Sequence, residues 1–210
     1  MCGFKKKRYK SILLFGSPGS GKGTQGQILH RIPGLHHLSS GEVFRNLHPE
    51  SENGELFHSL AGHGNLVPDD VTVRIVRDDI QARIEQQLFD PDQELLLLDG
   101  IPRSPNQAEL MEDELDVIKI ILLNIHDQRE IVRRLKTRAH EQQRKDDARE
   151  DVIMRRLEVY HRETKPVLDC YSPDKMIDID AGLSPISVLC RIVQAIEPVM
   201  NNVLCSARKM

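Results

Sequence analysis

Residues 16–25 read GSPGSGKGTQ and follow directly on the apolar run ILLF at residues 12–15. This order predicts a buried strand, a glycine-rich turn and a helix, with Lys22 where the turn ends. Glycines allow successive backbone N–H groups to point inward without a clash from Cβ. These donors, the helix N-terminus and the lysine together form a cradle for polyphosphate. A plain surface turn would not explain the Lys-Gly-Thr ending, so the stretch predicts a phosphate-binding loop.

An acid and an arginine follow a second apolar run, since residues 95–103 read LLLLDGIPR. An acid at the end of a buried strand beside a phosphate loop is placed to orient Mg²⁺ through water. We predict this role for Asp99, with a helix-cap or turn role as the alternative. Because Gly23 stands where such loops usually carry Ser or Thr, the hydroxyl of Thr24 comes one position late, which favours water-mediated metal contact. Arg103 suits bidentate recognition of phosphate.

The bulk composition is that of one ordinary globular domain. The chain has 210 residues, of which 39% are hydrophobic and 29% charged, enough to bury a core. Its net charge of −3 argues against a general nucleic-acid binder, so the positive charge that phosphate needs must be local. The four cysteines and nine histidines show no zinc spacing and no disulfide framework. No apolar run approaches the roughly 20 residues that span a membrane.

The two ends of the chain are expected to lie outside the core. The basic start, residues 2–8, has no apolar segment of the kind a secretory signal needs. Cys2 stands where myristoylation requires glycine. We interpret this start as a solvated lead-in, with an organelle-targeting or anionic-surface role as the alternative, and residues 204–210 as a frayed tail. With free thiols that fit a reducing compartment, these features predict a cytoplasmic protein.

Short apolar runs alternate with helical periodicity along the chain. The expected strands are residues 12–15, 35–38, 94–99, 118–123 and 176–179. The expected helices are residues 23–31, 69–88, 127–138, 149–170 and 184–196. This alternation predicts an α/β domain with a five-stranded parallel sheet flanked by helices. Two segments, residues 39–67 and 139–143, lack core periodicity and come where ligand loops of α/β folds lie.

Other polar residues extend the anion-binding pattern. Ser40 and Arg45 alone are a weak indication of a second anion-binding site. Together with residues 99–103 they indicate such a site more strongly. Arg138 and Arg144 bracket residues 139–143, and a mobile hairpin with an arginine at each root could close on phosphates and expel water. Other arginines of this region are assigned to a solvated helix face: Arg129, Arg133, Arg149 and Arg155.

Together these ordered motifs resemble those of the adenylate kinases and the wider nucleoside monophosphate kinase family. The similarity covers residues 9–196, and its landmarks are residues 16–25, 37–41, 45, 64–69, 99–103, 107, 138, 144–147 and 156–157. The resemblance implies a P-loop nucleotide kinase fold in a single domain, residues 1–210. Its core would be residues 1–38, 68–136 and 148–210, with a monophosphate-binding flap at 39–67 and a short lid, without zinc, at 137–147.

The resemblance also implies which residues bind each substrate. ATP would be bound by Gly19, Ser20, Gly21, Lys22, Gly23, Thr24, Arg134, Arg138 and Ser184. AMP would be bound by Ser40, Arg45, Asn65, Leu66, Val67, Gly100, Arg103, Gln107, Arg144 and Arg156. Catalysis would depend on Lys22, Arg103, Arg138, Arg144 and Arg156, with Mg²⁺ near Asp99. No general base is required because the acceptor phosphate is already ionised, so catalysis consists of positioning and charge stabilisation.

The implied reaction is reversible, Mg²⁺-dependent conversion of ATP and AMP to two ADP, in a monomer that needs neither nucleic acid nor membrane. Ser40 and Gln107 favour AMP, because pyrimidine monophosphate kinases of this family tend to carry alanine and asparagine at these places. Buried hydrogen-bonding groups reject a wrong base strongly, since a mismatch leaves them unpaired. A UMP or CMP kinase and a non-catalytic nucleotide-binding regulatory module stay open as alternatives.

The sequence departs from the family pattern in a few places. Ile101 replaces the usual aromatic residue and Glu42 the usual aspartate, and residues 139–143 lack the common lid glycine. Between Asp147 and Arg156 the chain has one residue more than the family pattern predicts, and this leaves the choice between Arg155 and Arg156 open.

Overall fold

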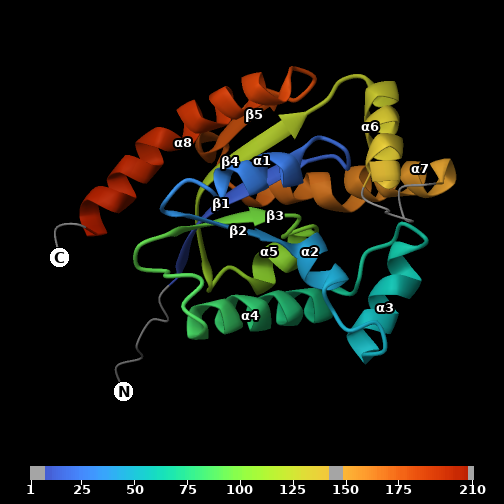
Figure 1. The fold of residues 1–210 in the computed structure, drawn as a ribbon, viewed down its shortest axis with the longest axis horizontal. Coiled ribbons are helices and arrows are strands. Elements are labelled where there is room, and N and C mark those ends of the chain that lie inside the picture. The colour runs from blue at the N-terminus through green and yellow to red at the C-terminus, as the bar shows by residue number, and fades with distance from the viewer. Residues whose placement is uncertain (1–7, 142–148, 208–210) are drawn as a thin grey trace.

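The computed structural model describes residues 8–141 and 149–207, with side chains as far as residue 202 (Figure 1). Its strands are β1 (Tyr9–Gly16), β2 (Leu35–Ser39), β3 (Leu95–Asp99), β4 (Leu115–Asn124) and β5 (Met176–Asp180). They form one sheet in the order β2-β3-β1-β4-β5, and every neighbouring pair is parallel. The predicted five-stranded parallel α/β sheet is therefore confirmed.

The helices that flank this sheet connect consecutive strands or follow them. They are α1 (Lys22–Leu29), α2 (Ser40–Arg45), α3 (Glu52–Ala61), α4 (Asp69–Glu85), α5 (Pro105–Leu110), α6 (Gln128–Glu141), α7 (Glu150–Val159) and α8 (Pro185–Ala207). In Figure 1, α8 lies above the sheet and α4 below it. Within the residues described, no helix combines the length and apolar character needed to cross a membrane.

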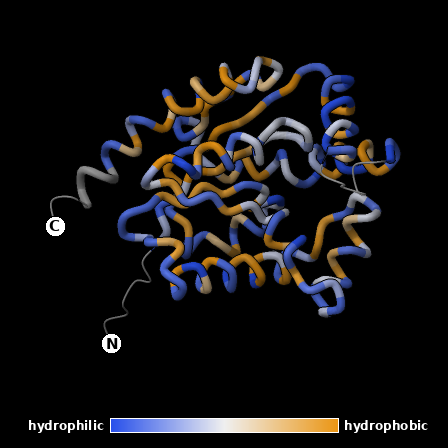
Figure 2. Tube along the Cα trace, in the orientation of Figure 1, coloured by the Kyte–Doolittle hydropathy of each residue, from blue (hydrophilic) through white to orange (hydrophobic). Residues whose placement is uncertain are grey.

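The strand β3 shows why the sheet is buried on both sides. Its leucines alternate between two clusters: Leu96 and Leu98 pack with α2 and α4, and Leu95 and Leu97 pack with α1 and α8. All of them are fully buried. Figure 2 shows the corresponding hydrophobic strands at the centre of the fold. A parallel strand covered by helices on both faces needs a continuous apolar run, which is the pattern read from the sequence.

Several expectations about the helices were wrong. Residues 39–67 show no core periodicity in the sequence, yet α2 buries Val43 and Phe44 in the core. The helix expected over residues 149–170 is α-helical only as far as Val159, and a π-helical turn (Tyr160–Thr164) and a 3₁₀ segment (Lys165–Cys170) follow. Pro166 accounts for this break, since proline has no N–H for the helical ladder.

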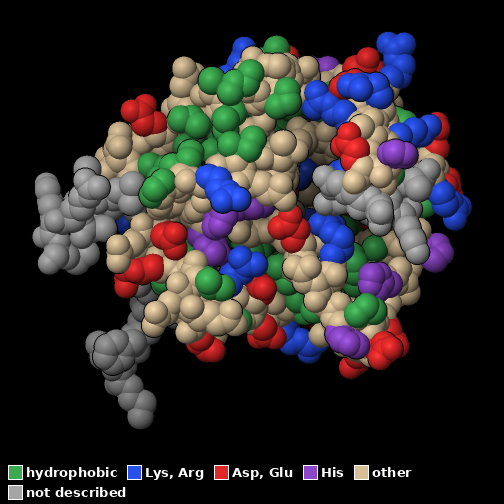
Figure 3. All heavy atoms as spheres, in the orientation of Figure 1, with side chains coloured by type: hydrophobic (Ala, Val, Ile, Leu, Met, Phe, Trp, Pro, Cys, Tyr) green, Lys and Arg blue, Asp and Glu red, His purple; other side chains and the backbone are tan. Residues whose placement is uncertain are grey.

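The frayed tail expected at residues 204–210 is instead helical as far as Ala207. In α8, Ile192, Ile196 and Met200 recur at every fourth position and are buried, and this stripe carries the helix past its expected end. Ile186 and Val193 of the same helix are exposed, and Figure 3 shows hydrophobic side chains gathered over this helix. The helix α6 also continues to Glu141, so the first residues of the expected hairpin are helical.

Candidate active site

A cavity of about 520 Å³ opens where the carboxyl ends of β1, β2 and β3 meet. Parallel α/β sheets bind ligands at this edge. The cavity brings together most of the predicted site residues: Gly19, Ser20, Gly21, Lys22, Gly23, Thr24, Ser40, Arg45, Asn65, Leu66, Val67, Asp99, Gly100, Arg103, Gln107, Arg134, Arg138 and Arg156. Arg144 lies outside the described residues. Ser184 does not line the cavity, although its neighbours Leu183 and Pro185 do.

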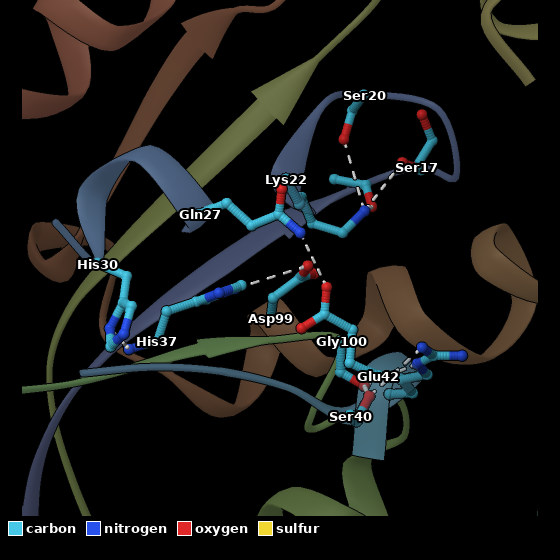
Figure 4. Close-up of polar contacts among 12 residues, drawn as sticks. Ser17, Ser20, Lys22, Gln27, His30, His37, Ser40, Glu42, Asp99 and Gly100 are labelled. Carbon is cyan, nitrogen blue, oxygen red and sulfur yellow. Dashed lines mark hydrogen bonds and ion pairs between the residues drawn. The ribbon is translucent and has the colours of Figure 1, made fainter. Parts of the chain in front are cut away.

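The phosphate loop joins β1 to α1 and closes around the amino group of Lys22. Its Nζ donates to the carbonyl oxygens of Gly16 at 2.6 Å and Ser17 at 3.0 Å (Figure 4). Gly19 and Gly21 have φ of 82° and 94°, in the left-handed region that favours glycine. The loop thus needs its glycines for backbone shape and holds its lysine pointing into the turn.

The charge on Lys22 is destabilised by its surroundings. Burial lowers the pKa of this lysine to about 8, the carboxylate of Asp99 opposes the shift, and the charges of Arg103, Arg138 and Arg156 add to it. Four cations therefore lie within electrostatic reach of one another around one cavity. Such an arrangement is costly without an anion, and it suits a ligand that carries several negative charges.

Asp99, the last residue of β3, lies at the wall of the cavity. Its side chain is 10% exposed, and its Oδ2 lies 4.0 Å from Nε2 of His37. A Cβ at Gly23 would lie 3.7 Å from the same oxygen, so the carboxylate faces the first turn of α1. No cluster of three His, Cys, Asp or Glu side chains that could hold a metal occurs in residues 8–141 and 149–207. A single carboxylate such as that of Asp99 could hold Mg²⁺, which commonly takes one or two carboxylates and completes its shell with waters and substrate phosphates.

A network of hydrogen bonds organises the other end of the cavity. The carbonyl oxygen of Gly100 accepts from Oγ of Ser40 at 2.6 Å and from Nε of Arg103 at 2.7 Å. Oε1 of Gln107 accepts from the backbone N–H of Arg103 at 2.7 Å. Ser40 and Gln107 are each 1% exposed. Burial lowers the pKa of Arg103 to about 10, with Arg156 contributing, so this guanidinium stays charged at neutral pH.

Helix α6 packs directly on the phosphate loop. A Cβ at Gly19 would lie 3.1 Å from Cγ of Leu135 and 3.2 Å from the carbonyl oxygen of Ile131. The same helix carries Arg138 to the cavity, and Arg134, whose Nε donates to Oε1 of Glu130 at 2.7 Å. Hydrogen bonds from arginines lower the pKa of Glu130 to about 2. The helix is therefore packed against the loop, and the ion pair with Glu130 orients Arg134.

Comparison with known proteins agrees with this geometry. The adenylate kinase family model matches residues 14–176. The chain belongs to the adenylate kinase family. A relative named adenylate kinase from Kocuria rhizophila is 38% identical over 192 residues, covering 89% of this chain and 98% of the relative. Adenylate kinases of Streptomyces avermitilis and Flavobacterium psychrophilum are 34% and 33% identical over 208 and 198 residues. These cover 83% and 91% of this chain, and 91% and 98% of the relatives.

The sequence of this adenylate kinase family member left open which of two neighbouring arginines of α7 contacts phosphate, and the structure places the two differently. Arg156 lines the cavity. Arg155 instead pairs with Glu158 at 2.7 Å and donates to Oδ1 of Asn65 at 3.3 Å. The geometry thus favours Arg156 as the residue that could contact phosphate.

Several residues that line the cavity had no predicted role in binding. Phe44 and Phe57 stack with ring centroids 5.4 Å apart and line the cavity. Arg133, assigned to a solvated face, reaches the rim while its side chain stays 68% exposed and paired with Glu130. The departure Ile101 is fully buried in the core under α2 and α4. Phe44 lies beside Val43 in the six-residue helix α2, which is too short to show a helical period in the sequence.

Proposed function

We propose that the chain catalyses reversible, Mg²⁺-dependent phosphoryl transfer from ATP to AMP, giving two ADP. The observation that carries the proposal is the convergence of Lys22, Arg103, Arg138 and Arg156 on one cavity. Two polyanions repel each other, and fixed cations offset this repulsion without reorganising at the moment of transfer. Membership of the adenylate kinase family supports the same reaction.

The proposed roles follow the two ends of the cavity. The phosphate loop, residues 19–24, would bind the ATP phosphates, with Lys22 on the outer oxygens. Arg134, Arg138 and the backbone near Ser184 would complete the ATP site. Bound Mg²⁺ would neutralise phosphate charge, and the Asp99 carboxylate would hold it through water.

At the acceptor end, Arg45 and Arg103 would bind the AMP phosphate. The buried Ser40 and Gln107, with Gly100 and residues 65–67, would face the base. Arg156, together with Arg144 from the segment outside the described residues, would stabilise the phosphoryl group in transfer.

The proposed organisation is one domain with a flap at residues 39–67 and a short lid at 137–147, which close when both nucleotides are bound. Closure would exclude water, so that ATP is transferred and not hydrolysed. We further propose a cytoplasmic monomer that acts on free nucleotides, with no nucleic-acid or membrane partner.

The test is to incubate the purified protein with Mg·ATP and, in separate reactions, AMP, CMP, UMP or GMP, and to follow products by chromatography. ADP formed rapidly with AMP alone supports the proposal. Rapid turnover with a pyrimidine monophosphate instead would overturn the choice of acceptor. Tight ATP binding without turnover on any acceptor would indicate a nucleotide-binding regulatory module.

A further inference from the structure

The amide of Gln107 is held at both ends. Its Oε1 accepts from the backbone N–H of Arg103 at 2.7 Å, and its Nε2 donates to Oδ1 of Asp69 at 2.8 Å. A backbone N–H can only donate, and an ionised carboxylate can only accept. The two partners therefore permit one orientation of the amide and disfavour the orientation in which its oxygen and nitrogen are exchanged.

Asp69, the first residue of α4, does not line the cavity, and of its three described hydrogen-bond partners Gln107 is the one that does. Its Oδ2 accepts from Oγ of Ser104 at 2.8 Å and from Nδ2 of Asn106 at 3.0 Å. Ser104 in turn caps α5 by accepting from the backbone N–H of Gln107 at 3.0 Å. Three side-chain donors thus converge on one carboxylate, which ties the start of α4 to the start of α5.

We infer that Asp69 is a positioning residue that sets base discrimination by fixing the orientation of the Gln107 amide. This inference rests on the proposed function, because it names how the acceptor base is selected. An amide has two N–H groups and two oxygen lone pairs. With one of each taken by Asp69 and Arg103, one donor and one acceptor remain for a ligand, in a fixed order.

That order separates two classes of purine. The edge of adenine offers the N1 acceptor beside the 6-amino donor, and the edge of guanine offers the N1–H donor beside the 6-oxo acceptor. An amide that pairs with one edge must exchange its oxygen and nitrogen to pair with the other. Exchange at Gln107 would point an oxygen at the carboxylate of Asp69 and an N–H at the N–H of Arg103. Two oxygens or two N–H groups that face each other in a buried site are costly. The fixed amide therefore rejects 6-oxopurines.

The experiment compares Asp69→Ala and Asp69→Asn with wild type. Steady-state rates give kcat and the KM values for AMP and ATP, and calorimetry gives dissociation constants for AMP and GMP. For Asp69→Ala we expect the KM for AMP to rise roughly 3–10-fold, the size of one lost hydrogen bond, with the KM for ATP unchanged. We also expect the preference for AMP over GMP in binding to fall at least about fivefold, because only Arg103 then opposes amide exchange.

Two controls separate this role from a general structural one. Asp70→Ala removes the same charge from the same first turn of α4, at an exposed side chain, and should change none of these constants. In a Gln107→Leu background, Asp69→Ala should leave the AMP-to-GMP preference unchanged, because the group it positions is gone. Asp69→Asn keeps the side-chain volume and can donate to an exchanged amide, so it should relax the preference even if Asp69→Ala folds poorly.

The inference is overturned if both Asp69 variants weaken AMP and GMP equally, or if Asp69→Ala changes the preference as much without Gln107 as with it. Failure of the proposed function gives a different result. In that case wild type does not phosphorylate AMP, while the ratio of AMP to GMP dissociation constants still reports on Asp69.

Discussion

Gly26, inside α1, lies so close to the ring of His37 that no side chain fits between them. A Cβ at this glycine would lie 2.3 Å from Nε2 and 2.6 Å from Cδ2 of the ring. Helix propensity alone favours alanine over glycine by about 1 kcal/mol. We therefore expect the effect of Gly26→Ala to depend on whether the ring is present.

The magnitude follows from two opposed terms. Forcing a methyl group into a packed site costs about 1–3 kcal/mol, and the ring of His37 has little room to yield, since it is 5% exposed and faces Asp99. Gly26→Ala should thus lower the free energy of unfolding by up to about 2 kcal/mol once the gain in helix propensity is subtracted. In a His37→Ala background the obstacle is gone, and the same change should raise stability by about 0.5–1 kcal/mol.

The assay is urea unfolding, followed by circular dichroism, of wild type, the two single variants and the double variant. The difference between the two backgrounds is the coupling energy, which equals the steric cost of about 1–3 kcal/mol. If Gly26→Ala destabilises both backgrounds equally, the ring is not the obstacle and the reasoning is wrong.

The remaining predictions concern charge. Lys22→Ala and Arg138→Ala should each lower kcat by about 10²–10³, as loss of other preorganised donors does; near-normal turnover in rate assays would exclude these roles. Because burial lowers the pKa of Lys22 to about 8, the free protein loses this charge as the pH rises through 8, and its affinity for ATP should fall above that pH. Binding of ATP at pH 8.5 should therefore take up protons, which calorimetry in buffers of different ionisation enthalpy measures. Burial also lowers the pKa of His36 from 6.5 to about 4, so between pH 6.5 and pH 4 the unfolded chain binds more protons than the folded one. The free energy of unfolding should therefore fall by up to about 3 kcal/mol from pH 7 to pH 4. Urea titrations of His36→Phe should show a smaller dependence of this free energy on pH. Hydrolysis of ATP without AMP should be far slower than transfer to AMP, and equal rates in both conditions would count against closure.

Local patterns were the ones that the sequence predicted well. The glycine-rich turn after β1 and the leucine-rich strand β3 both depend on residues a few positions apart. Strand positions were confirmed because a parallel strand buried on both faces shows itself as an unbroken apolar run. The strand positions predict the parallel sheet, and a parallel sheet opens its ligand cavity at the carboxyl ends of its strands.

What the sequence did not show depends on contacts between distant segments. Asp69 and Gln107 lie 38 positions apart, and nothing in the local sequence of either indicates that they meet. The choice between Arg155 and Arg156 could not be made because neighbouring helical positions differ by about 100° in direction, so a shift of one residue exchanges the inward and outward arginines. Only the packing of α7 through Ile153 and Leu157 against α6 determines which one faces the cavity.

The cations around the cavity also have a kinetic consequence, because they belong to a chain whose formal net charge is −3. An anion that approaches elsewhere meets an overall negative surface, while the cavity attracts it, so the field guides small polyanions toward one opening. Such guidance acts over about a Debye length, roughly 10 Å at 0.1 M salt. The association rate of a nucleotide should therefore fall steeply as ionic strength rises, while its dissociation rate, governed by short contacts inside the cavity, should change little.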